Sequence, residues 1–98
     1  MDVIFRVVIR GRVQGVGYRA WAEVTAVELG VEGWVRNCRD GSVEAVLAGP
    51  EEVVLTMIEL FRDGPRGARV DAIDQREAGA ADLALRRPGD LFSVLGSS

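Results

Sequence analysis

Histidine and lysine are both absent from this chain of 98 residues, and arginine supplies all 12 of its basic side chains. Without histidine, no imidazole can act as a general base near neutral pH, and Ser-His or Cys-His nucleophile pairs are excluded. Without lysine, Schiff-base chemistry and the P-loop lysine are excluded as well. An enzyme of this composition has to work with arginine, carboxylates, amides, hydroxyls and backbone N–H groups.

Cysteine and histidine, the usual ligands of structural zinc, are scarce too. The single cysteine excludes an internal disulfide, and with no histidine beside it a structural zinc site is not expected. No pair of acidic residues has the spacing of a glycosidase or a metal site. We therefore expect no metal site.

Long apolar runs are also missing, since none approaches the roughly 20 residues of a membrane span. The first residues already follow a strand-like pattern, so we expect no signal peptide. The hydrophobic content of 48% is ordinary for a globular protein. We expect a cytoplasmic protein without a membrane partner, folded as one domain over residues 1–98.

The charge distribution is uneven. A net charge of −3 argues against a general nucleic-acid binder. Between residues 6 and 19, however, there are four arginines and no acid, at Arg6, Arg10, Arg12 and Arg19. This stretch is either a solvated strand face or part of an anion site.

Hydrophobic periodicity predicts an α+β fold. Alternation over residues 3–10 predicts a strand, and apolar residues at helical spacing predict a helix from 18 to 29. Strands over 31–37 and 42–48 follow, joined by an Asp-Gly turn. A second helix begins after Pro50 and stops at Gly64, a strand follows over 68–76, and residues 78–89 are expected to be a loop. The order is the ferredoxin-like βαββαβ, an open sandwich with both helices on one face of a mostly antiparallel sheet. Residues 91–95 offer a short fifth strand.

The segment from Gly11 to Tyr18 lies between the first strand and the first helix. Its glycines let backbone N–H groups turn inward, and the helix start adds unpaired donors, which together suit a phosphate-sized anion. Arg19 can add a bidentate contact to phosphate oxygens. Asn37 ends the second strand at the same sheet edge, where its amide can hold a water. A plain turn at each place is the alternative.

These residues carry a resemblance. Residues 9–19 read IRGRVQGVGYR, and residues 33–37 read GWVRN, followed by Gly41, Val43 and Gly49. The two segments resemble the phosphate-loop motif and the second motif of the acylphosphatase family. One departure is Tyr18, where the family usually has phenylalanine. The resemblance covers residues 3–77 and fades afterwards.

The resemblance implies a small monomeric α/β sandwich that hydrolyses the carboxyl–phosphate bond of small acyl phosphates without a metal or a cofactor. It implies that Arg19 and Asn37 are catalytic, with Asn37 orienting the attacking water. The phosphate is expected on the loop amides of Gly15, Val16, Gly17, Tyr18 and Arg19. A non-catalytic anion-binding module on the same fold is the alternative. An RNA-recognition domain is disfavoured, because the expected third strand lacks exposed aromatic and basic residues.

Overall fold

A five-stranded sheet organises residues 1–97, the part of the chain that the computed structural model describes. The order across the sheet is β4-β1-β3-β2-β5. The parallel pair is β2 with β5, and the other three pairs are antiparallel. The fold class predicted from the sequence is thus confirmed, and the fifth strand lies beside β2. The strands are β1 (Asp2–Arg12), β2 (Glu32–Asn37), β3 (Val43–Pro50), β4 (Arg69–Glu77) and β5 (Phe92–Val94).

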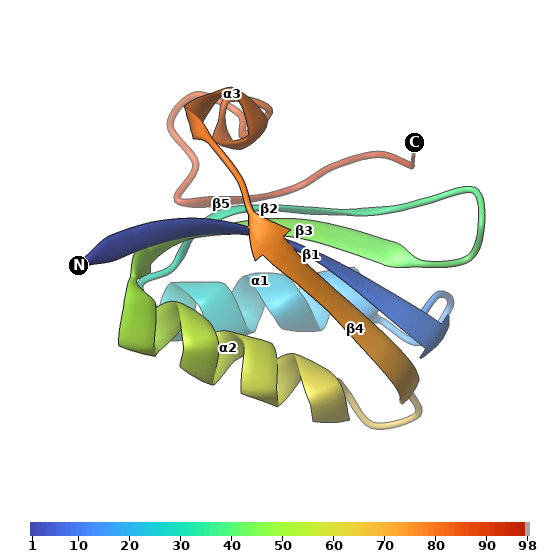
Figure 1. Cartoon of the computed structure of the whole chain (residues 1–98). Coiled ribbons are helices and arrows are strands. Elements are labelled where there is room, and N and C mark those ends of the chain that lie inside the picture. Colours follow the sequence, from blue (N-terminus) through green and yellow to red (C-terminus); the bar gives the residue numbers. More distant parts are fainter. Residues whose placement is uncertain (98) are drawn as a thin grey trace.

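Two long helices, α1 (Tyr18–Leu29) and α2 (Glu51–Asp63), cover one face of the sheet, as Figure 1 shows. Helix α1 ends at Gly30, whose φ of 74° is the left-handed conformation that glycine adopts at helix ends. Helix α2 follows Pro50 and has Glu51 and Glu52 in its first turn. Their negative charges interact favourably with the positive end of the helix dipole. Both helices lie where the sequence predicts them.

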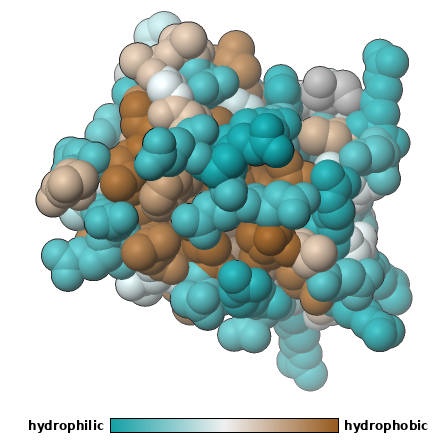
Figure 2. Space-filling model, viewed as in Figure 1, coloured by the Kyte–Doolittle hydropathy of each residue, from teal (hydrophilic) through white to brown (hydrophobic). Residues whose placement is uncertain are grey.

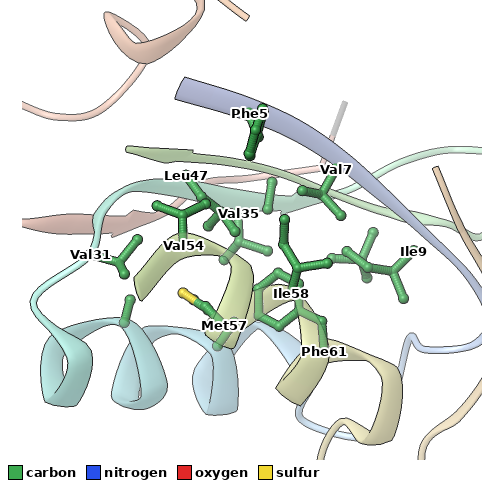
Figure 3. Close-up of a cluster of buried hydrophobic side chains, with 14 of the residues drawn as sticks. Phe5, Val7, Ile9, Val31, Val35, Leu47, Val54, Met57, Ile58 and Phe61 are labelled. Atoms are coloured by element: carbon green, nitrogen blue, oxygen red, sulfur yellow. The ribbon is translucent and has the colours of Figure 1, made fainter. Parts of the chain in front are cut away.

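The core fills the layer between the sheet and these helices. Alternate residues of β1 (Phe5, Val7 and Ile9) point into this layer, and Figure 3 shows them above the apolar side of α2. The residues that α2 contributes are Val54, Met57, Ile58 and Phe61, all buried. The opposite face of the central strands carries charged side chains such as Arg6 and Glu44, and it also holds a second set of buried apolar residues, namely Val8, Trp34, Val46 and Ala48.

The segment over residues 78–89 corrects a prediction. It is not simply a loop, because it contains a short helix, α3 (Ala80–Leu83), on the face of the sheet opposite α1 and α2 (Figure 1). The Gly79 N–H donates to the Asp82 carboxylate at 2.9 Å, and the Trp34 indole N–H donates to the Asp82 carbonyl at 2.7 Å. The helix therefore forms where a long-range contact with Trp34 holds it, which local periodicity does not reveal.

The first strand also runs further than predicted. Gly11 and Arg12 belong to β1 and not to the following loop, and the pairing with β4 shifts between Arg10 and Gly11. A side chain at Gly11 would meet the Arg69 carbonyl oxygen at 2.2 Å. Glycine is required there because the two backbones approach so closely.

The arginine-rich stretch divides between two faces of the molecule. On the open face of the sheet, Arg6 pairs with Glu44, and Arg10 lies 3.3 Å from both Asp40 and Asp74. These two arginines are therefore part of a surface charge network and not of a common anion site. Figure 2 shows hydrophilic side chains over much of the visible surface, with hydrophobic ones between them. Among the described residues, no helix has the length and apolar character to cross a membrane.

Tyr18, the first residue of α1, anchors that helix in the core. Its ring is 2% exposed and its hydroxyl donates to the Phe61 carbonyl at 2.6 Å. The ring also makes edge-on contacts with Trp21 and Phe61, with centroids 5.3 and 5.7 Å away. The start of α1 is thus fixed against the end of α2.

Burial raises the pKa of the Tyr18 phenol well above its ordinary value of 10.0. The folded protein therefore holds this proton more tightly than the unfolded chain does. The stabilisation is complete below the unfolded pKa near 10 and is lost as the pH rises toward the folded pKa. We expect Tyr18→Phe to reduce this alkaline loss of stability, measured by urea unfolding at several pH values.

Phenolate absorbance gives a direct check, because the chain has one tyrosine. In the native protein the phenolate should appear only well above pH 10, whereas in urea it should appear near the ordinary value. A native titration near pH 10 would contradict the burial argument.

Candidate active site

The start of α1 is built to attract an anion. Its N-cap, Gly17, supplies no side-chain cap, and the first turn holds no acid, unlike the first turn of α2. The N–H groups of the first turn and the positive end of the helix dipole are therefore available. In the loop before it, Gly15 and Gly17 have φ values of 74° and 78°, the left-handed conformation that turns successive amides toward one side.

A pocket of about 410 Å³ lies at this helix start. Its walls come from three separate parts of the chain, namely the loop with the first turn of α1, the end of β2, and the segment that ends β5. Of the predicted site residues, Gly15, Gly17, Tyr18, Arg19 and Asn37 line it. The other lining residues are Val13, Gln14, Ala20, Val94, Leu95 and Gly96.

Arg19 is the only charged side chain among the lining residues that the structure describes. It follows Tyr18 in the first turn of α1 and is half-buried, so its neighbour points into the core while its own side chain reaches the pocket. Its Nη1 donates to the Leu95 carbonyl oxygen at 3.0 Å. That bond uses one of five guanidinium N–H groups and leaves the others for an anion.

Asn37 reaches the same pocket from the far end of β2. Strands β1 and β2 both run antiparallel to β3, so their C-terminal ends share one edge of the sheet. Asn37 is the last residue of β2 and pairs with Val43. The structure therefore brings together Arg19 and Asn37, which the topological argument predicted to be neighbours.

Val16 is the one predicted phosphate-loop residue outside the lining of this pocket. Its side chain is half-buried and packs against the hydrophobic core. Any contact with an anion would have to come from its backbone N–H, so its phosphate-binding role stays a prediction.

Gln14 is a residue of this site to which the sequence alone assigned no role. Its Nε2 donates to the carbonyl oxygens of Cys38 and Ser42, both at 2.8 Å. These two carbonyls belong to the turn directly after Asn37. Gln14 thus ties the loop before α1 to the hairpin that carries Asn37, and the position of Gln14 inside the first motif was the only available signal.

The hairpin turn itself is held by Asp40. Its Oδ1 accepts from the Ser42 backbone N–H at 2.9 Å and from the Ser42 hydroxyl at 2.6 Å. Hydrogen bonds from the Ser42 hydroxyl and backbone, together with Arg10, lower the pKa of the Asp40 carboxyl. Asp40 therefore has the turn role that the sequence predicts. Over residues 1–97, no three His, Cys, Asp or Glu side chains converge to hold a metal ion.

The bridge through Gln14 yields a prediction. Gln14→Leu removes both donors and should lower the free energy of unfolding by about 1–2 kcal/mol, as expected for two net hydrogen bonds. It should also weaken binding of inorganic phosphate, because the loop and the hairpin are no longer held together. Urea unfolding and a calorimetric phosphate titration measure the two effects.

Gln75→Leu is the matched control, since Gln75 is exposed on β4. It should change stability by no more than about 0.5 kcal/mol and leave phosphate binding intact. Equal effects of the two substitutions would contradict the bridging role.

Comparisons with known proteins identify the family of this chain. Residues 5–83 match the family model described as Acylphosphatase. A curated acylphosphatase of Bradyrhizobium diazoefficiens is 59% identical over 92 residues, which are 94% of this chain and 93% of that relative. The acylphosphatase structure from Bacillus subtilis has a TM-score of 0.82 and 31% identity, over 97% of this chain and 99% of the other. That from Coxiella burnetii has a TM-score of 0.83 and 29% identity, over 96% and 93%. The resemblance carried by the two sequence motifs is thereby confirmed, and the chain belongs to the acylphosphatase family.

Proposed function

We propose that this protein hydrolyses small acyl phosphates, with Arg19 holding the phosphoryl group and Asn37 orienting the attacking water. The observation that carries the proposal is that both side chains line one pocket at an uncapped helix start. The reaction breaks the bond between phosphorus and the acyl oxygen. Water supplies the new oxygen on phosphorus, and the products are a carboxylate and inorganic phosphate.

Binding of the phosphoryl group rests on backbone and guanidinium donors. The amides from Gly15 to Arg19 surround the phosphoryl oxygens, and Arg19 adds charge and up to two parallel hydrogen bonds. As negative charge spreads over the equatorial oxygens during transfer, donors already in place stabilise it without having to reorganise.

The attacking water is the role proposed for Asn37. Its carboxamide has one acceptor oxygen and two N–H donors, so it can hold a water in line with the bond that breaks. This contributes positioning and no charge. The proton that the water loses passes to a phosphate oxygen of the substrate itself, since the lining residues that the structure describes include no carboxylate, imidazole or thiol to accept it.

This chemistry suits a chain without histidine or lysine. An acyl phosphate is a mixed anhydride whose carboxylate leaves readily, so the leaving group needs little acid catalysis. The principal barrier lies in bringing water to an anionic phosphorus, which electrostatic preorganisation lowers.

A module that binds an anion without turning it over is the second candidate. The same cradle would serve it, and Arg19 alone would suffice. The presence of Asn37 in the same pocket favours the enzyme, because a simple anion site has no need of a water-holding amide. Steady-state hydrolysis of benzoyl phosphate separates the two, since a binding module would take up inorganic phosphate with no turnover.

The roles of the two residues predict different kinetic losses. Arg19→Ala should lower kcat/KM for benzoyl phosphate by roughly 10²–10³-fold, the scale of a lost oxyanion donor, and should weaken phosphate binding as well. Asn37→Ala should lower kcat far more than it lowers phosphate affinity, because Asn37 contacts the water and not the bound anion.

Arg12→Ala is the control for Arg19, since Arg12 is exposed at the end of β1 and lies outside the pocket lining. It should retain wild-type kinetics. Near-wild-type turnover by Asn37→Ala would refute the water-positioning role, whereas unchanged phosphate binding by Arg19→Ala would refute the phosphate-binding role.

Hydrolysis should not depend on an added metal ion. The proposed mechanism uses backbone amides, Arg19 and Asn37, so a chelator should leave benzoyl phosphate turnover unchanged. The measurement is the steady-state rate with and without EDTA, followed by addition of Mg²⁺. Loss of activity in the chelator and its recovery with Mg²⁺ would contradict the mechanism.

The monomeric state and the cytoplasmic location stay predictions of the sequence.

A further inference from the structure

A second pocket lies on the face of the sheet opposite α1 and α2. Its volume is about 160 Å³, and β1, β4 and the turn after β2 form its walls. Its charged lining residues are three arginines and two aspartates, namely Arg6, Arg10, Arg76, Asp40 and Asp74. Over residues 1–97, none of its lining residues also lines the pocket at the start of α1, so the two pockets are separate.

Two positive charges face each other at this second pocket. In the antiparallel pairing of β1 with β4, Arg6 is directly opposite Arg76. Side chains in such positions start only about 4.5–5.5 Å apart, and like charges there destabilise a sheet. The two strands thus carry a repulsive pair at a place where an acid opposite an arginine would stabilise them.

The buried carboxylate beside this pair is divided between two arginines. Glu44 is 4% exposed, and its two oxygens accept separately from Arg6 Nε and from Arg36 Nε. The bond to Glu44 engages the Nε of Arg6, and the two terminal nitrogens of the same guanidinium remain as donors for a ligand in the pocket. Glu44 therefore neutralises Arg6 only in part.

The two aspartates of the pocket are paired with Arg10. Asp74 lies 3.3 Å from Arg10 Nε, and Asp40 lies 3.3 Å from Arg10 Nη1. No ion pair in the described part of the chain includes Arg76, whose side chain is exposed. Each carboxylate at the pocket is thus already shared with an arginine, and Arg76 keeps a full positive charge opposite Arg6.

We infer that this pocket is a second anion site, in which a compact oxyanion such as inorganic phosphate bridges Arg6 and Arg76. An anion between the two guanidinium groups replaces their repulsion by two charge-assisted contacts, and the planar guanidinium matches the spacing of phosphate oxygens. The volume lies well below the roughly 300–1,000 Å³ of sites for larger ligands, so we expect a small ion and not a nucleotide. The inference does not depend on the proposed hydrolysis.

An NMR titration of the full chain with inorganic phosphate tests the two pockets separately. The backbone amides of Gly15 and Gly17 report on the pocket at the start of α1. The Nε–H of Arg6, which Glu44 holds, reports on the second pocket. We expect both sets of signals to shift with phosphate, whereas chloride at the same ionic strength, which only screens charge, should leave the Arg6 signal nearly unchanged.

Arg76→Gln removes one of the two bridging charges. It should weaken the phosphate response of Arg6 by about fivefold or more, the scale of a lost charged contact, and leave the response of Gly15 and Gly17 intact. Arg69→Gln is the matched control, because Arg69 also lies on β4 opposite an arginine, Arg12, but outside the pocket lining. It should leave both responses as in the wild type.

Urea unfolding gives a second measurement. Phosphate should raise the urea midpoint of the wild type, because a ligand that binds the folded state stabilises it. The rise should be smaller in Arg76→Gln and unchanged in Arg69→Gln. Without phosphate, Arg76→Gln should be at least as stable as the wild type, since it removes the repulsion between the opposed arginines.

Three results would overturn the inference. Phosphate shifts confined to Gly15 and Gly17 would show that the second pocket takes no anion. Equal weakening by Arg76→Gln and Arg69→Gln would show general attraction by positive charge and not a site. A urea midpoint of Arg76→Gln below that of the wild type without phosphate would show that Arg76 already has a favourable partner within the protein.

Discussion

The hydrogen bond from the Tyr18 hydroxyl to the Phe61 carbonyl ties the start of one helix to the end of the other. Because Tyr18 is the first residue of α1, fixing its ring in the core fixes the direction in which the next residue points. Arg19 consequently faces the pocket. The loop before α1 is held at its C-terminal end, where Tyr18 is bonded to Phe61. The phosphate-binding role proposed for Arg19 requires a guanidinium held in this way, since ordering a flexible arginine would cost conformational entropy.

Hydrogen bonds of Gln14 and Arg19 connect the other parts of the site to the start of α1. Gln14 connects the loop to the hairpin that follows Asn37, and Arg19 itself bonds to the backbone after β5. Three segments that are far apart in sequence, the loop with the start of α1, the end of β2 and the residues after β5, thus meet at one pocket. Among its described lining residues, Arg19 is the only charged one. In the proposed mechanism, the precise placement of amides and one guanidinium replaces the titrating side chains that this chain, without histidine or lysine, cannot supply.

Much of this arrangement could be predicted from sequence because it is encoded locally. The alternation in β1, Gly30 after α1 and Pro50 before α2 are short-range signals, and the crossover rule placed Asn37 beside the loop. The contacts that could not be predicted are long-range. Helix α3 depends on Trp34, and the pocket wall at Leu95 depends on a parallel pairing with β2. Neither long-range contact produces a hydrophobic periodicity in the sequence of α3 or of the segment around Leu95.

The two tryptophans of the chain lie on opposite sides of the sheet. Trp21 packs beside Tyr18 and Phe61 in the helix layer, whereas Trp34 is bonded to the carbonyl of Asp82 beneath α3. Each indole is therefore a local fluorophore for a different layer of the molecule. Variants that keep one tryptophan would let emission from the layer of α1 and α2 be followed apart from emission beside α3.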